Sequence, residues 1–160
     1  MEMFLDKHQT FLNDLVNGGV RFIIIGGYAV IYHGYVRTTG DLDIWLEPDN
    51  RSKEKLLAVL LCHGISKKSV QKLAGLNFEE VVAFHFGDPP ERVDFLTQLS
   101  GLSFDPSYAK SVILDLPSCK LHILHLSDLI INKMMTTRLR DKADVEELLK
   151  IQSVKRKMGF

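Results

Sequence analysis

Apolar residues recur along the chain with two different periods, one typical of helices and one typical of strands. Between residues 4 and 16 they return every three to four positions, and the pair Gly18–Gly19 would end such a helix. Between 42 and 46 they alternate with polar residues, as in a half-buried strand. These periods predict helices at about 4–16, 28–32, 50–62, 128–135 and 141–151, and strands at about 21–25, 42–46, 81–86, 92–97, 112–116 and 120–124.

Strands interspersed with helices predict an α/β or α+β fold, in which helices pack on a small mixed sheet. No internal repeat or flexible linker divides the 160 residues, so we expect a single domain over residues 1–151. The apolar periodicity is lost beyond it, and we expect 152–160 to form a short basic tail. The composition agrees, because 46% hydrophobic and 25% charged residues are typical of a globular domain and exclude a disordered chain or a disulfide scaffold.

The sequence lacks the features of a membrane or exported protein. Its longest apolar stretch, 22–32, is interrupted by Gly26–Gly27 and is shorter than the roughly 18 residues that suggest a membrane span. Residues 1–6 include acids where a signal peptide has a basic start. We therefore expect a cytoplasmic protein that has no membrane contact. Cys62 and Cys119 match no metal or redox spacing, and we expect both to be buried thiols.

The charge of the chain is balanced overall but uneven in one place. Twenty basic and twenty acidic residues cancel, so no global charge attracts a nucleic-acid backbone. From 133 to 160 there are eight Lys or Arg residues against four acids. This local excess could bind an anionic ligand, or it could be the ordinary basic end of a helix. It is the single feature that favours a sequence-reading nucleic-acid binder.

Two glycines, Gly26 and Gly27, lie between the predicted strand at 21–25 and the predicted helix at 28–32. Glycines at such a junction let the backbone approach a ligand closely, and the start of the helix offers free N–H groups to an anion. Strand-to-helix turns also use glycine for steric reasons alone. The pair by itself is therefore a weak signal of a phosphate site.

Three acids fall on the polar faces of predicted strands. Asp41 and Asp43 are two residues apart, so their side chains share one face, where two carboxylates repel unless water or a cation intervenes. Magnesium suits this arrangement, because it is held by one or two carboxylates and substrate phosphates. Asp94, on a later strand, could join them and activate a hydroxyl. The alternatives are a solvated acidic edge strand for the first two and an exposed Asp94 paired with Arg92.

In chain order, these features resemble the signature of the polymerase-beta-like nucleotidyltransferase superfamily. That signature is a small-residue pair, an Asp-x-Asp strand and a third acid on a later strand. The resemblance covers about residues 20–150 and is greatest to the branch related to abortive-infection and toxin–antitoxin nucleotidyltransferases. The residues that carry it are Gly26–Gly34, Arg37, Thr39, Asp41, Asp43, Asp128–Ile130, Lys133 and Arg138–Val145, with Arg140 where Lys is commoner.

The resemblance implies a nucleotidyltransferase fold and a metal-dependent enzyme. Asp41, Asp43 and Asp94 would be catalytic and would hold a divalent metal, Mg²⁺ or Mn²⁺. Gly26 and Gly27 would cradle the phosphates of a nucleoside triphosphate (NTP). The family also places a lysine at Lys133 that can reach these phosphates, although a solvated lysine on a helix is an equally ordinary interpretation. Arg37 and Thr39 are expected to support the metal-binding strand.

The implied reaction transfers a nucleoside monophosphate from an NTP to a hydroxyl acceptor and releases pyrophosphate. The acceptor could belong to a protein, an RNA or a small molecule, and a partner protein or a homo-oligomer could complete a toxin–antitoxin-type system. The alternative is a catalytically silent, antitoxin-like regulator of the same fold that acts through a partner protein. The short chain and neutral charge favour the regulator, whereas three acids at one edge of a sheet favour the enzyme.

Overall fold

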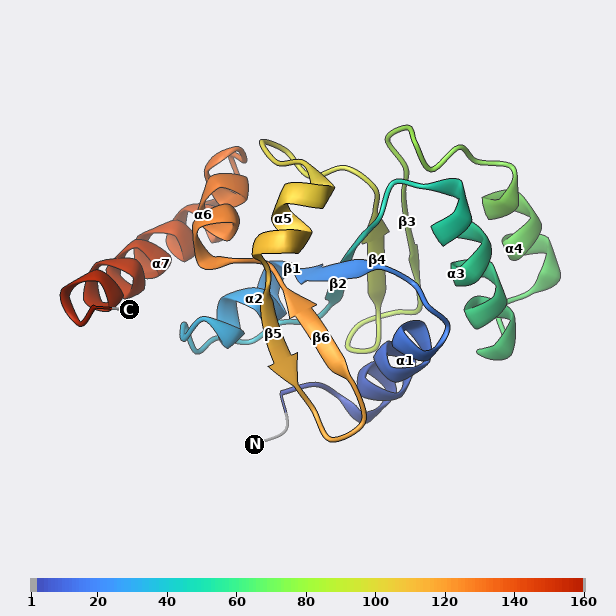
Figure 1. Ribbon diagram of the computed structural model, residues 1–160, viewed down its shortest axis with the longest axis horizontal. Coiled ribbons are helices and arrows are strands. Elements are labelled where there is room, and N and C mark those ends of the chain that lie inside the picture. The colour runs from blue at the N-terminus through green and yellow to red at the C-terminus, as the bar shows by residue number, and fades with distance from the viewer. Residues whose placement is uncertain (1–2, 160) are drawn as a thin grey trace.

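The computed structural model describes residues 3–159 and has a six-stranded mixed sheet at its centre (Figure 1). Strand β2 runs parallel to β4, and β1 runs parallel to β6, whereas the other neighbouring pairs are antiparallel. This confirms the predicted mixed α/β sheet. The strands are β1 (Phe22–Ile25), β2 (Leu42–Leu46), β3 (Ala83–Phe86), β4 (Val93–Leu96), β5 (Val112–Asp115) and β6 (Lys120–Ile123), in the order β3-β4-β2-β1-β6-β5.

Helices cover both faces of this sheet. Figure 1 shows α3 and α4 at one end of the molecule and α6 and α7 at the other. Within residues 3–159, none of the helices is both long and apolar enough to cross a membrane. The helices are α1 (Asp6–Asn17), α2 (Gly26–Tyr32), α3 (Asn50–Cys62), α4 (Lys67–Ala74), α5 (Phe104–Lys110), α6 (Leu126–Met134) and α7 (Leu139–Lys157).

The two faces of β2 and β4 have different environments. On one face, Phe95 of β4 packs against Phe11 of α1, with ring centroids 6.0 Å apart. On the other face, Trp45 of β2 packs against Phe104 of α5 at 5.4 Å. Asp43 shares the face of Trp45, because it lies two residues earlier in the same strand. On this face of β2, the side chains therefore change from apolar at Trp45 to polar at Asp43.

The structure corrects several of the predicted helices. Helix α2 begins at Gly26 rather than at residue 28, so both glycines belong to its first turn. Helix α6 begins at Leu126 rather than at residue 128, and its N-cap is His125, whose side chain accepts a hydrogen bond from the N–H of Ser127. Helices α4 and α5 are not predicted, because eight and seven residues are too few to show a helical period clearly.

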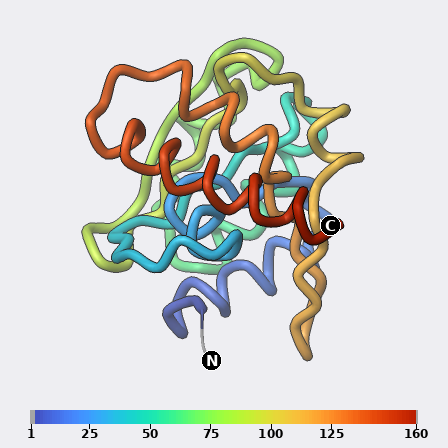
Figure 2. Tube along the Cα trace, turned by 90° about the vertical axis from the view of Figure 1, so that its left-hand side faces the viewer, coloured from blue at the N-terminus to red at the C-terminus, as the bar shows by residue number. Residues whose placement is uncertain are grey.

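The last helix is longer than its apolar pattern indicates. Helix α7 has 19 residues and continues to Lys157, so residues 152–157 of the expected tail extend this helix. Figure 2 shows α7, in red, lying across one end of the molecule. Lys and Arg are good helix formers, and the helix therefore continues where the apolar face fades. The cysteines also differ from expectation, since Cys62 is exposed and Cys119 is half-buried.

Candidate functional site

All six predicted site residues line one cavity of about 560 Å³. This volume lies within the range of small-molecule sites. The cavity lies between the start of α2, strands β2, β3 and β4 with the loop that precedes β2, and the α6–α7 region. The predicted residues that the structure brings together here are Gly26, Gly27, Asp41, Asp43, Asp94 and Lys133.

The carboxylates meet because β2 and β4 are neighbouring parallel strands. Asp43 and Asp94 are direct partners in the register of these strands, so their side chains emerge side by side on one face. Asp41 lies just before β2, on the same face as Asp43. One oxygen of Asp41, Oδ1, is buried and accepts no hydrogen bond from any residue within 3–159. This orphaned acceptor is a position at which a cation or water would be stabilised.

The crowding of these acids changes the ionisation of Asp43. The pKa of Asp43 is raised to about 6, mainly by burial and also by the negative charges of Asp94 and Asp41. The positive charges of Lys133 and Arg138 oppose this rise. Three carboxylates therefore lie close together in the site, with Lys133 and Arg138 near enough to affect the ionisation of Asp43.

Gly26 lets the Asp43 carboxylate lie directly against the backbone. Its φ of +64° is in the left-handed region, which glycine adopts without steric cost. A Cβ added at Gly26 would overlap Oδ2 of Asp43. At Gly27 a Cβ would overlap Oγ1 of Thr39. Both glycines are therefore required by close contacts with the loop and strand that carry the acids.

We expect Gly26→Ala to lower the free energy of unfolding more than Gly64→Ala does. Both glycines have positive φ, +64° and +80°, so each substitution carries a backbone cost of roughly 1–2 kcal/mol. A Cβ at Gly64 meets no atom within 4 Å, whereas one at Gly26 must displace the Asp43 carboxylate. Urea unfolding of the two variants measures the difference. Equal losses would show that Asp43 moves aside freely.

The donors present fit a hard divalent cation. Mg²⁺ is held by one or two carboxylates together with water and substrate phosphates, which Asp41 and Asp43 can satisfy. Within residues 3–159, no three His, Cys, Asp or Glu side chains are already arranged as a set of metal ligands. The third acid, Asp94, is engaged elsewhere.

Asp94 forms an ion pair with Arg92. From the sequence, this pairing is the alternative to a role of Asp94 in metal binding. The Arg92 Nε lies 3.2 Å from Oδ1 and 3.0 Å from Oδ2 of Asp94, and Nη2 lies 2.9 Å from Oδ1. The hydrogen bonds to Asp94 are the main reason that the pKa of Arg92 is raised, with further contributions from Asp41 and Asp43. Asp94 therefore lines the cavity with both of its carboxylate oxygens hydrogen-bonded to Arg92.

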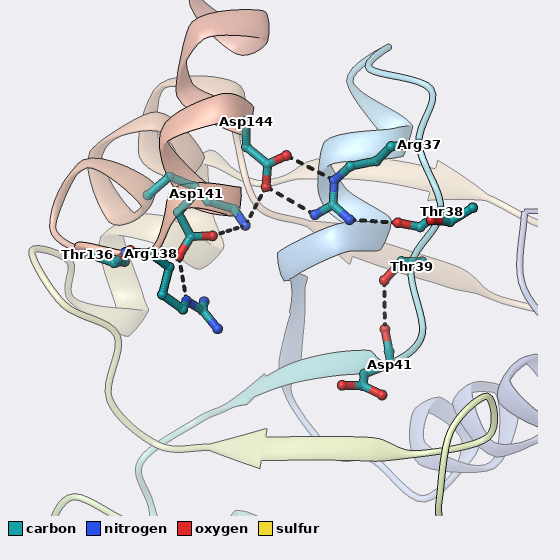
Figure 3. A network of polar contacts seen from close by, with 9 residues as sticks. Arg37, Thr38, Thr39, Asp41, Thr136, Arg138, Asp141 and Asp144 are labelled. Atoms are coloured by element: carbon teal, nitrogen blue, oxygen red, sulfur yellow. Dashed lines mark hydrogen bonds and ion pairs between the residues drawn. The ribbon is translucent and has the colours of Figure 1, made fainter.

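A buried network of charges forms the opposite wall (Figure 3). Lys133 Nζ lies 2.8 Å from Oδ1 of Asp141 and 2.9 Å from Oδ2 of Asp144. All three side chains are at most 6% exposed. Lys133 thus lines the cavity while its ammonium group is held by two carboxylates. Its predicted contact with nucleotide phosphates stays a prediction.

The network extends to the loop that leads into β2. Arg37 Nη2 donates to Oδ2 of Asp144 at 3.0 Å, and its Nε lies 2.9 Å from Oδ1. Arg37 also donates to the carbonyl of Thr38, and Thr39 Oγ1 donates to the carbonyl of Asp41 (Figure 3). Helix α7 is therefore tied to the backbone beside the acids. This is the supporting position that we expect for Arg37 and Thr39.

The hydrogen bonds of this network change the ionisation of Asp141. Burial alone would raise its pKa, but hydrogen bonds from Lys133, Thr136 and Arg138 outweigh burial and lower it to about 2. Asp141 is therefore ionised at every pH at which the protein is ordinarily studied.

Arg140 and His85 also line the cavity and are not among the predicted site residues. Five cationic side chains line it, and four of these are paired with aspartates: Arg37, Arg92, Lys133 and Arg138. Arg140 is the one that makes no ion pair within residues 3–159. His85 of β3 is the register partner of Asp94 and faces the same cavity. Strand alternation predicts which side chains share a face with His85. It does not predict that β3 pairs with β4, and this pairing is what places His85 beside Asp94.

Comparison with known proteins supports the fold. Neither a protein-family model nor a curated protein sequence matches the chain. Among solved structures, it is similar to the lincosamide antibiotic adenylyltransferase LnuA in its lincomycin-bound crystal structure, with a TM-score of 0.50 and 12% sequence identity. The match covers 92% of this chain and 98% of that one. The chain therefore has a nucleotidyltransferase fold, as its sequence motifs imply.

Proposed function

We propose that the protein is a metal-dependent nucleotidyltransferase that transfers a nucleoside monophosphate from an NTP to a hydroxyl acceptor. The observation that carries this proposal is the convergence of the six predicted site residues in one cavity of a nucleotidyltransferase fold. The cavity holds both carboxylates, which suit a divalent cation, and cationic side chains, which suit a phosphate chain.

The phosphates of the NTP lie beside Gly26 and Gly27, where the first turn of α2 presents N–H groups next to the Asp43 carboxylate. Arg140 meets the phosphate chain first, because the other cationic side chains of the cavity are paired with aspartates. Lys133 adds its charge from the wall behind. Asp41 and Asp43 would hold Mg²⁺ or Mn²⁺, which when bound supplies positive charge to the phosphates.

In the reaction, the acceptor oxygen forms a bond to the α-phosphorus and the bond to the β-phosphate oxygen breaks. Pyrophosphate leaves, and the proton of the acceptor hydroxyl passes to Asp94, which faces the same space. This transfer requires Asp94 to free one oxygen from Arg92. Most of the rate enhancement comes from positioning and charge neutralisation.

The acceptor is best sought first among small molecules. The structural neighbour is by name a lincosamide antibiotic adenylyltransferase, and the match covers nearly all of both chains. Protein and RNA hydroxyls remain the other acceptor classes, within a toxin–antitoxin-type system or outside one. A second candidate function is a catalytically silent regulator of the same fold, which the engaged state of Asp94 favours.

Thermal unfolding with each of the four NTPs, in Mg²⁺ or in EDTA, tests the proposal. A ligand at 100 times its Kd adds about 2.7 kcal/mol to the free energy of unfolding, which shifts Tm measurably. We expect at least one NTP to raise Tm in the presence of Mg²⁺. The double variant Asp41→Asn/Asp43→Asn should lose this shift. Asp115→Asn, which changes an exposed acid of β5, should keep it.

A transfer assay then distinguishes the two candidate functions. It uses the NTP that stabilises the protein, labelled at its α-phosphate. Label transferred to a hydroxyl acceptor supports the enzyme. A shift in Tm without transfer to small molecules, RNA or protein supports the silent regulator. No shift with any NTP contradicts the enzyme and favours the regulator that acts through a partner protein.

A further inference from the structure

The guanidinium of Arg92 occupies both carboxylate oxygens of Asp94. Three N–O contacts of 2.9–3.2 Å join them, which is a fork-like arrangement and among the strongest ion pairs that side chains form. The two residues are two positions apart at the start of β4 and share one face. Both side chains also line the cavity that holds Asp41 and Asp43.

Asp94 is the register partner of Asp43, so its oxygens lie beside the position at which Asp41 and Asp43 would hold a cation. A divalent ion that used these two oxygens would share them with the Arg92 guanidinium, and the two positive charges would repel each other. Within the described residues, the three acids line one cavity without forming a set of three metal ligands.

Resting on the proposed function, we propose that Arg92 is a positioning residue that competes with the divalent cation for Asp94. Asp41 and Asp43 bind the cation first, and Asp94 joins them only when Arg92 releases it. The Arg92 side chain is 34% exposed and faces the cavity, so a released guanidinium has room to move. The phosphates of a bound NTP are the partner that it then meets, since arginine binds phosphate with the same fork.

The test is a double-mutant cycle on Mn²⁺ affinity, measured by calorimetry on the full chain without nucleotide. The proteins are the wild type, Arg92→Gln, Asp94→Asn and the double variant. We expect Arg92→Gln to bind Mn²⁺ about tenfold more tightly, because it frees a third carboxylate. Asp94→Asn should bind like the wild type, since Asp94 is already engaged. The double variant should lose the gain of Arg92→Gln.

Arg140→Gln is the matched control for the removal of a positive charge. Arg140 lines the same cavity and makes no ion pair within residues 3–159, so its removal changes the field without freeing a carboxylate. We expect Arg140→Gln to raise the Mn²⁺ affinity less than Arg92→Gln does. Adding Asp94→Asn should not change this smaller gain. Arg92→Lys keeps the charge but loses the fork, and its Mn²⁺ affinity should fall between those of the wild type and Arg92→Gln.

Two outcomes overturn the inference and are distinguishable from each other. If Asp94→Asn weakens Mn²⁺ binding in the wild type as much as it does in Arg92→Gln, Asp94 is available from the start and Arg92 does not compete. If neither the wild type nor Arg92→Gln binds Mn²⁺ in a way that Asp43→Asn abolishes, the metal site of the proposed function fails together with this inference. The Tm of each variant shows that it is folded.

Discussion

Asp43→Asn is expected to reduce nucleotidyl transfer on the order of 10³-fold while leaving the fold intact. Asp43 is the acid at the centre of the site, beside Asp94 in the register and directly against Gly26. Asparagine has nearly the same shape, so packing against Gly26 is kept. The substitution removes one of the two charges that fit the cation.

The fold should tolerate this change, because a crowded negative charge is removed and no ion pair to Asp43 is broken within residues 3–159. Label transfer from the stabilising NTP measures activity, and urea unfolding measures stability. Asp115→Asn, outside the cavity, is the control and should match the wild type in both. Full transfer activity in Asp43→Asn would contradict the assignment of the site.

Lys133→Met is expected to lower the free energy of unfolding by about 3–5 kcal/mol. Lys133 is the cation shared by Asp141 and Asp144, and all three side chains are buried. Methionine fills similar space but leaves both carboxylates with less positive charge. Lys142→Met, an exposed position on α7, should change stability by no more than about 0.5 kcal/mol. Similar losses in the two variants would mean that the network adds no stability.

Acid unfolding gives an independent measure of the same network. The pKa of Asp141 is about 2 in the folded protein and near 3.8 when unfolded, so its ionised form stabilises the fold above pH 4. This stabilisation, about 2 kcal/mol, is lost as the pH falls from 4 towards 2. Asp141→Asn should lack that part of the pH dependence in urea unfolding between pH 7 and 2.5. Parallel curves for the two proteins would contradict the lowered pKa.

The sequence predicts the parts of the site that depend on local pattern. Alternation in residues 42–46 places Asp41 and Asp43 on one face, and the glycine pair marks the end of β1. What brings Asp94 beside Asp43 is the parallel pairing of β2 with β4. The chain between these strands contains two helices and β3, and no local signal specifies which strands will pair.

The network around Lys133 shows a different limit. Lys133 and Asp141 are eight residues apart, on either side of the turn between α6 and α7, so no helical spacing relates them. Arg37 reaches Asp144 across 107 positions. A lysine or aspartate on a helix is ordinarily solvated, and only the packing of α7 against α6 removes these side chains from water. The sequence therefore identifies the residues but not their burial.

The tie between Arg37 and Asp144 also sets an order of events during synthesis. Ribosomes add roughly 5–20 residues per second, so Asp144 is made roughly 5–20 s after Arg37. Until then Arg37 lacks the carboxylate that anchors it, and the loop before Asp41 is not fixed from that side. The glycine turn and all three acids are thus translated well before the support that positions them. We therefore expect the nascent chain to acquire an ordered site only as one of its last steps of folding.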